Sequence, residues 1–242
     1  MMTIPKILSS FFLLLVPLLS SLLANALSSS SSSSVTKPAR FITNKMCPFA
    51  QKAWIALEAS NADYSLEQVS LYGAGGKPDW FWELNPQGTV PVLVVSTTDD
   101  STDDDAVVVI PDSDLILNDI AQVPGGETLI PTDDPEAAES VKKFRQCLSE
   151  FLPIGKKAVL GVSKGPMWSK LKELDALVVG PYVCGDYVTV ADCAGFPFLW
   201  RIENEYGNLE KKDCPNLANW LQTCKQNPAF SKTVQSSWWW WW

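Results

Sequence analysis

Cys47 is the residue with the clearest chemical potential, because it precedes the predicted start of a helix. Pro48 follows it and is favoured at the first position of a helix, and one apolar helical stripe comes next: Ala50, Ala53, Trp54 and Leu57. A thiol at a helix N-terminus faces unpaired backbone N–H groups and the positive end of the helix dipole, which can lower its pKa from about 8.5 to about 3.5–7.5. The alternative is a buried structural cysteine, and the helix after Cys47 favours a reactive thiolate.

The other residues of the chain exclude several kinds of catalysis and metal binding. The chain has no histidine, which excludes Ser-His-Asp hydrolysis, Cys-His proteolysis and His-ligated zinc. None of its six cysteines falls in a Cys-x-x-Cys pair, so no metal site and no dithiol motif are expected, and the other five are expected to be small buried thiols. Ala50 stands where a second redox cysteine would follow Cys47. A monothiol site must be recycled by an external thiol, and glutathione is the abundant one.

The chain length and charge set the broad class. The 242 residues suffice for one large domain or two small ones, and a hydrophobic share of 46% allows a packed core. The net charge of −8 argues against nucleic acid as a partner.

The elements around Cys47 follow a recognisable order. Strands are predicted at Arg40–Thr43, Tyr64–Val69, Val90–Val95 and Val107–Ile110, with helices after Cys47, at Lys77–Trp82 and at Ser113–Ala121. The order β-α-β, a connection, and then β-β-α predicts an α/β thioredoxin-like domain over residues 41–124.

The second half predicts an all-α C-terminal domain over residues 131–233. A helix is expected to begin at Pro135, and apolar stripes at helical spacing recur along the segment. Thr189 and Asp192 form a capping-box pattern at the start of another helix. Phe198 and Trp200 are candidates for a second-substrate site, although core packing is the better expectation.

Four motifs in order resemble cysteine-type glutathione transferases: Met46–Lys52, Lys77–Phe81, Leu84–Val92 and Pro111–Ile116. They are most similar to plant-type dehydroascorbate reductases, with the lambda and omega classes near, and the resemblance covers residues 39–233. It implies the glutathione transferase architecture, with Cys47 as the nucleophile. Ala50 departs from the serine usual in the reductases, which leaves the class open.

The resemblance also implies a glutathione-binding set, which consists of Pro48, Phe49, Lys77, Val90, Pro91, Asp112 and Ser113. In this family pattern Lys77 holds the glycine end of glutathione. Val90 pairs its backbone with the tripeptide, and Pro91 is the cis proline that presents this edge. Asp112 and Ser113 bind the γ-glutamyl end, Asp112 through the ammonium and Ser113 at a helix start that suits a carboxylate. Simple N-capping by Ser113 and a solvated Lys77 are the plainer interpretations.

The function implied is a glutathione-dependent reductase or thioltransferase. Dehydroascorbate is the favoured substrate, followed by glutathionylated thiols and small disulfides. The alternative is a non-catalytic binding protein of the same fold, similar to the chloride intracellular channel proteins. The expected partners are glutathione and a small oxidised substrate, without nucleic acid and without stable membrane insertion, in a monomer or a dimer.

The two ends of the chain are expected to lie outside the fold. Met1–Lys6, the apolar run Phe11–Leu19 and the small residues Ala24–Ala26 resemble a secretory signal, and the serine-rich, acid-free stretch Leu27–Arg40 resembles a transit peptide. Residues 1–40 therefore predict a two-part leader to a plastid of secondary origin, with secretion or the ER lumen as the alternative.

Two further segments have no expected role in catalysis. The acidic segment Asp99–Asp105 is expected to be a solvated loop and not a calcium site. The tail 234–242 ends in a run of tryptophans that no fold requires and that is interpreted as an artefact of the sequence.

Overall fold

The computed structural model describes residues 38–71, 76–97 and 106–235. Residues 1–37 of the predicted leader, the acidic segment Asp99–Asp105 and the run Trp238–Trp242 lie outside the described residues. The last leader residues, Ala39 and Arg40, belong to the first strand, Ala39–Thr43, so the fold begins before the predicted boundary at residue 40.

A four-stranded mixed sheet forms the first half of the described chain. Its strands are β1 (Ala39–Thr43), β2 (Tyr64–Gln68), β3 (Val92–Thr97) and β4 (Ala106–Pro111), in the order β2-β1-β3-β4. β1 pairs in parallel with β2, whereas β1–β3 and β3–β4 are antiparallel. A parallel pair needs a crossover connection, and helix α2 (Pro48–Ala59) supplies it. The predicted thioredoxin-like order is therefore confirmed.

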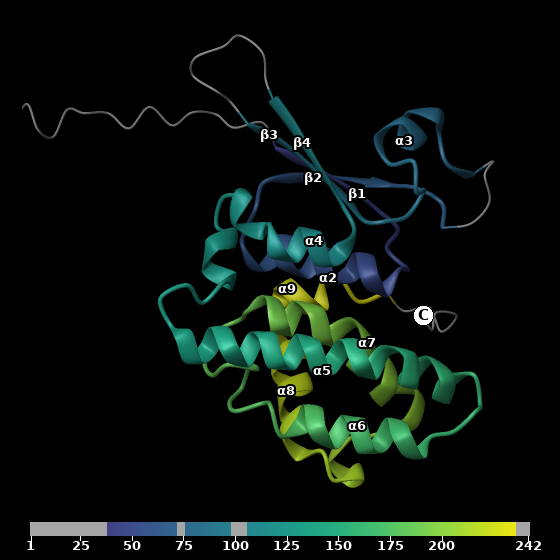
Figure 1. Cartoon of the computed structure of the whole chain (residues 1–242), viewed down its shortest axis with the longest axis vertical. Coiled ribbons are helices and arrows are strands. Elements are labelled where there is room, and N and C mark those ends of the chain that lie inside the picture. The colour runs from purple at the N-terminus through teal and green to yellow at the C-terminus, as the bar shows by residue number, and fades with distance from the viewer. Residues whose placement is uncertain (1–37, 72–75, 98–105, 236–242) are drawn as a thin grey trace, which may run out of the picture. The chain divides into compact units, whose positions relative to one another are not determined.

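Side chains alternate between the two faces of the sheet along each strand, so each face contributes apolar residues to its own cluster. Phe41 and Leu93 join the main core, toward α2 and α4 (Ser113–Asn118). Their neighbours Ile42 and Val92 join a smaller cluster with Phe81 of α3 (Asp79–Leu84) on the opposite face. Figure 1 shows α2 and α4 between the sheet and the later helices.

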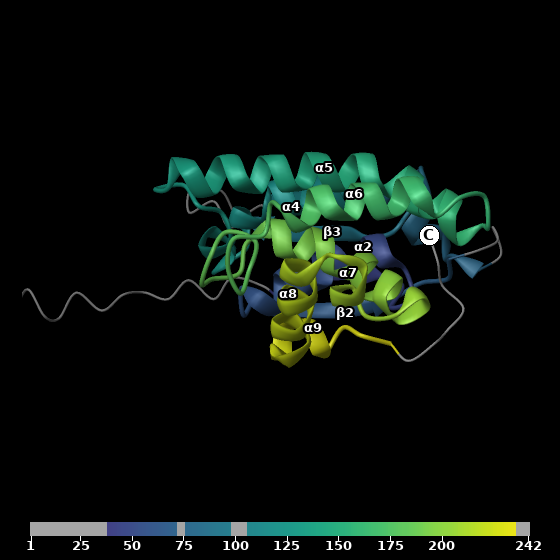
Figure 2. The ribbon, with the colours of Figure 1, turned by 90° about the horizontal axis from the view of Figure 1, so that it is seen from below.

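The second half of the described chain is helical, as predicted. Its α-helices are α5 (Pro135–Val159), α6 (Gly165–Asp175), α7 (Val190–Tyr206), α8 (Pro215–Gln226) and α9 (Pro228–Ser231). Short 3-10 turns lie at Ile120–Gln122, Gly126–Leu129 and Glu210–Lys212. Helix α5 runs alongside α6 and α7 (Figure 2), and α7 and α9 contact α2.

Asp192 secures the start of α7. The predicted capping box with Thr189 is present. The Asp192 carboxylate also accepts hydrogen bonds from the backbone N–H of Val183 and the indole N–H of Trp220, each at 2.8 Å. Asp192 is fully buried, so this carboxylate joins α7, α8 and the preceding loop.

The fold differs from the sequence prediction in local respects. The predicted strand Val90–Val95 begins at Val92, and the predicted helix Ser113–Ala121 ends at Asn118 and is followed by the 3-10 turn Ile120–Gln122. The cap of α4 is Asp112 and not Ser113: the Asp112 carboxylate accepts from the N–H groups of Asp114 and Leu115, and Ser113 is the first helical residue. Helix α9, of four residues, is too short to leave a periodic pattern and was not predicted.

All six cysteines are free thiols. Of the five that were expected to be buried, four are buried and Cys184 is half-buried. Within the described residues, no helix is long and apolar enough to cross a membrane.

Candidate active site

The strand register brings the predicted site residues to one edge of the sheet. β1 ends at Thr43, four residues before Cys47, and Ile42 of β1 pairs with Val92 at the start of β3. Val92 pairs in turn with Pro111 at the end of β4. The Cys47 loop, the Val90–Pro91 loop and the Asp112–Ser113 helix start therefore share this edge.

Asn44 shapes the turn that carries the thiol. Its side-chain oxygen accepts the N–H of Met46 at 3.0 Å, its amide donates to the Val69 carbonyl at 2.7 Å, and its own carbonyl accepts the N–H of Cys47 at 2.9 Å. Cys47 then takes the N-cap position of α2 with extended backbone angles, and Pro48 begins the helix, as predicted.

The Cys47 thiol is more enclosed than its sequence context suggests, since only 9% of the residue is exposed. This burial is the largest influence on the thiol and raises its pKa above the ordinary value. The N–H groups of Ala50 and Phe49 and the cations Arg201 and Lys52 act in the opposite direction. The expectation of a lowered pKa is therefore not met in the resting structure, because desolvation outweighs the helix N-terminus.

Arg201 of α7 is the cation that the sequence did not reveal. Its guanidinium is buried, with 8% of the residue exposed, and donates to the side-chain oxygen of Gln51 at 2.6 Å and to the Pro197 carbonyl. Burial lowers the pKa of Arg201 to about 10, and the negative charge that opposes this shift is that of Cys47. Arg201 therefore supplies positive charge from the helical half to the thiol.

Lys52 supplies a second cation, from the same helix as Cys47. Only 2% of it is exposed, and its ammonium pairs with Asp114 of α4 at 2.8 Å and lies 5.7 Å from the Phe49 ring centre. Asp114 also pairs with Arg145 of α5 at 3.2 Å. Burial acts to raise the pKa of Asp114, but Lys52 and Arg145 outweigh it and hold this pKa below its usual range. This ion-pair network fixes α2 against α4 and α5.

The predicted glutathione-binding residues outside α2 lie in three different environments. The Val90–Pro91 peptide is cis, and the Pro91 carbonyl accepts the N–H of Asp112 at 3.2 Å, which joins these two parts of the site. Ser113 is buried, whereas the Lys77 ammonium donates to the Leu71 carbonyl at 3.2 Å.

Aromatic packing closes the apolar side of the site. The ring of Phe49 meets Phe198 of α7 edge to face, with centroids 5.2 Å apart. Phe198 is almost fully buried, so the expectation that it packs in the core is met at the boundary with the Cys47 helix. Trp200 is half-buried, and its indole N–H has no partner within the described part of the chain.

Two domains of one known protein family match this chain. Residues 46–123 match the glutathione S-transferase N-terminal domain, and residues 169–228 match the C-terminal domain of the same family. A relative named probable glutathione S-transferase DHAR4, from Arabidopsis thaliana, is 31% identical over 199 residues, which cover 77% of this chain and 83% of the relative. The chain belongs to the glutathione S-transferase family.

Other comparisons agree with this glutathione S-transferase assignment. Glutathione S-transferase omega-1 of Sus scrofa is 26% identical over 205 residues, which cover 79% of this chain and 78% of that protein. The crystal structure of glutathione transferase Omega 1C from Trametes versicolor shares the fold, with a TM-score of 0.66 at 24% identity over 82% of this chain and 91% of that one.

A third comparison concerns the ligand. A glutathione transferase family member from Pseudomonas fluorescens, solved with two glutathione bound, has a TM-score of 0.61 at 17% identity over 81% of this chain and 92% of that one. Family membership supports glutathione as the ligand of this glutathione S-transferase. Among the described residues no group of three or more His, Cys, Asp and Glu side chains could hold a metal ion.

Proposed function

We propose that the chain is a glutathione-dependent reductase or thioltransferase with Cys47 as its nucleophile, and that dehydroascorbate is its favoured substrate. The observation that carries the proposal is the placement of a single thiol at the N-cap of α2, beside two backbone N–H groups and the cations Arg201 and Lys52. These groups stabilise negative charge on sulfur when the proton leaves. The likeness to the protein named probable glutathione S-transferase DHAR4 supports the glutathione-dependent family, and the motif resemblance to plant-type dehydroascorbate reductases is the reason for proposing this substrate.

The proposed cycle uses two glutathione molecules. The Cys47 thiolate adds to a carbonyl carbon of dehydroascorbate, and a glutathione thiol then attacks the Cys47 sulfur. The carbon–sulfur bond breaks, ascorbate leaves with the electron pair, and a mixed disulfide between Cys47 and glutathione remains. A second glutathione attacks this disulfide, which releases oxidised glutathione and the Cys47 thiolate. Two thiols are oxidised and one dehydroascorbate is reduced.

Glutathione is proposed to lie along the shared sheet edge. The backbone of Val90 before the cis Pro91 is free of the β3 ladder, which suits pairing with the tripeptide. Asp112 and Ser113 are proposed to receive the γ-glutamyl end, although capping already occupies one Asp112 oxygen. Lys77 would have to leave the Leu71 carbonyl to reach the glycine carboxylate.

Turnover with glutathione tests the proposal. Dehydroascorbate and hydroxyethyl disulfide are assayed side by side with the wild type, Cys47→Ser and, as a matched control, Cys184→Ser, which alters the half-buried thiol. We expect Cys47→Ser to abolish both reactions and Cys184→Ser to retain them. Unchanged turnover by Cys47→Ser would rule out the mechanism, and faster reduction of the disulfide would replace dehydroascorbate as the favoured substrate.

One observation favours a second candidate, a non-catalytic binding protein of the same fold. Burial raises the pKa of Cys47, so the resting thiol is less ionised than a free one. The discriminating measurement is labelling by iodoacetamide at about pH 6, where a catalytic thiol should react faster than a free thiol. A slower reaction, together with absent turnover, supports the binding protein.

We also propose that the protein resides in a plastid. A monothiol enzyme needs a reducing glutathione pool, and the ER lumen is held at about −180 to −210 mV against about −220 mV or lower in the cytosol. A fluorescent reporter fused to residues 1–45 tests this placement. A reporter found only in the medium or the ER contradicts it.

A further inference from the structure

Gln51 occupies a buried position between Cys47 and two distant parts of the chain. It lies one helical turn after Cys47, and its backbone N–H donates to the Cys47 carbonyl at 2.9 Å. Only 1% of Gln51 is exposed. Its side chain contacts Arg201 of α7 on one side and Thr233, which follows α9, on the other.

The orientation of the Gln51 amide is fixed by its neighbours. Its oxygen accepts from the Arg201 guanidinium at 2.6 Å, and a guanidinium can only donate. Its nitrogen donates to the hydroxyl and the carbonyl of Thr233 at 3.0 and 3.3 Å, and a carbonyl can only accept. The Thr233 hydroxyl itself donates to the Phe230 carbonyl at 2.8 Å, so its lone pair faces Gln51.

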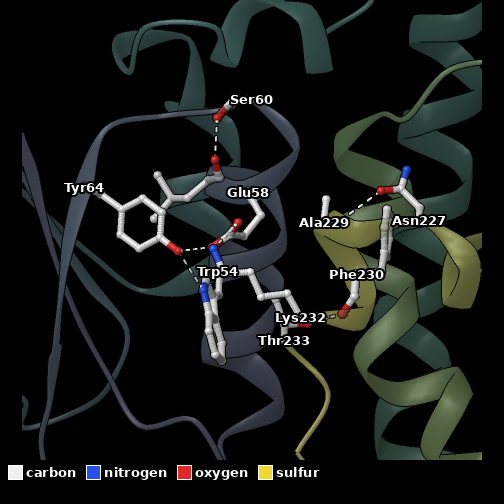
Figure 3. Close-up of polar contacts among 10 residues, drawn as sticks. Trp54, Glu58, Ser60, Tyr64, Asn227, Ala229, Phe230, Lys232 and Thr233 are labelled. Atoms are coloured by element: carbon white, nitrogen blue, oxygen red, sulfur yellow. Dashed lines mark hydrogen bonds and ion pairs between the residues drawn. The ribbon is translucent and has the colours of Figure 1, made fainter.

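Thr233 belongs to a segment, here called the C-terminal strap, that comprises residues 227–234 and lies against α2. Within the strap, the Asn227 side chain accepts the N–H of Ala229, and the Thr233 hydroxyl donates to the Phe230 carbonyl (Figure 3). The Lys232 ammonium pairs with the carboxylate of Glu58, near the end of α2, at 2.8 Å. Phe230 packs edge to face on Phe196 of α7, with centroids 5.1 Å apart. The strap therefore contacts both helices that supply groups to the site.

Arg201 differs from the other buried cation in how it is held. Lys52 has the carboxylate of Asp114 as its partner, whereas no carboxylate of the described residues pairs with Arg201. Two neutral oxygens, those of Gln51 and Pro197, anchor Arg201 instead. A buried cation is normally paired, because leaving its charge unpaired is costly. The neutral anchor fixes the position of Arg201 and leaves its charge to act on Cys47.

We propose that Gln51 is a positioning residue that holds Arg201 toward Cys47 and is itself held in register by Thr233 of the C-terminal strap. This inference rests on the proposed role of Cys47 as the reactive thiol. Docking of the strap and the charge on sulfur are then linked: a displaced strap frees the Gln51 amide, and Arg201 loses its alignment.

The pH profile of Cys47 alkylation by iodoacetamide tests the inference in the full chain, from about pH 6 to about pH 11.5, which covers a midpoint above the ordinary thiol value. The charged groups facing the thiol are Arg201 from α7 and Lys52 from α2. We expect Gln51→Met to move the midpoint up by about one pH unit, an approximately tenfold loss of rate below the midpoint. Thr233→Val, which keeps its backbone carbonyl, should lose about threefold. Lys172→Met removes an exposed ion pair with Asp213, outside both this network and the strap, and should leave the midpoint unchanged.

The possible outcomes separate this inference from a structural role and from the proposed function. A wild-type midpoint in Gln51→Met overturns the inference even if the melting temperature falls, because a purely structural residue would lower stability alone. If Gln51→Met does not fold, an unchanged midpoint in Thr233→Val overturns it, as does an equal shift in the control Lys172→Met. Alkylation reports on the thiol without substrate, so failure of the reductase assay leaves this test intact.

Discussion

Replacement of Asp192 tests whether the start of α7 depends on one buried carboxylate. Four donors converge on it at 2.8 Å: one oxygen accepts from the Val183 N–H and the Trp220 indole, and the other from the N–H and the hydroxyl of Thr189. In Asp192→Asn one oxygen becomes an NH₂ group. If it faces Thr189, the hydroxyl can rotate to accept, but the backbone N–H meets another donor.

The magnitude follows from counting the donors left without an acceptor. A buried donor without a partner costs about 1–3 kcal/mol, so we expect Asp192→Asn to lose about 2 kcal/mol of unfolding free energy. Asp192→Ala leaves all four donors unpaired, and we expect about 4–5 kcal/mol, at the upper end for single substitutions. At about 2–4 °C per kcal/mol for a chain of this size, the melting temperature falls by about 4–8 °C for Asp192→Asn and by about 8–20 °C for Asp192→Ala.

Thermal unfolding followed by circular dichroism measures these losses, with the exposed Asp186→Asn as a matched control that should melt like the wild type. If Asp192→Asn also melts like the wild type, the four hydrogen bonds do not secure α7. If it loses as much as Asp192→Ala, then the charge, and not the number of acceptors, is what matters.

Three further predictions concern other polar contacts. Asp114→Asn removes the carboxylate that pairs with the buried Lys52. Because the Asp114 side chain is 56% exposed, solvent screens the pair, and we expect a cost of about 1–2 kcal/mol in urea unfolding. In the wild type this contribution is present above about pH 4 and is lost as the pH falls through the lowered pKa of Asp114, so a variant equally stable at pH 7 would contradict it. Tyr64→Phe removes the hydroxyl that accepts from the Trp54 indole at 2.8 Å and should cost about 1 kcal/mol without changing Cys47 labelling; altered labelling would show that this contact reaches the site. Lys172→Met breaks an ion pair with a largely exposed aspartate and should leave the melting temperature unchanged within error; a clear drop would refute the low value assigned to exposed pairs.

The sequence could predict what depends on local pattern. Pro48 and the apolar stripe after it place Cys47 at a helix cap, and alternating strands identify the sheet, because both signals lie within a few residues of one another. The predicted start of α4 at Ser113 is confirmed, but the alternative of capping by Ser113 is wrong, since Asp112 and Ser113 are both good capping residues and only the backbone decides between them.

Contacts between distant segments could not be predicted in this way. Arg201 lies 150 residues from its partner Gln51, and no periodicity records that pairing. The same holds for the burial of Cys47, which no local pattern in the sequence records. The net rise in its pKa is therefore a property of tertiary structure, whereas the opposing helix N-terminus is visible in the sequence.

The contact between Gln51 and Thr233 also has a consequence for Cys47 during synthesis of the chain on the ribosome. The two residues are 182 positions apart. At a translation rate of about 5–20 residues per second, Thr233 is therefore synthesised roughly 10–35 seconds after Gln51. During this interval the nascent chain displays Cys47 without its strap, and for most of it without Arg201. A thiol that is enclosed in the finished protein is therefore open to oxidants and to trapping by other thiols while translation continues.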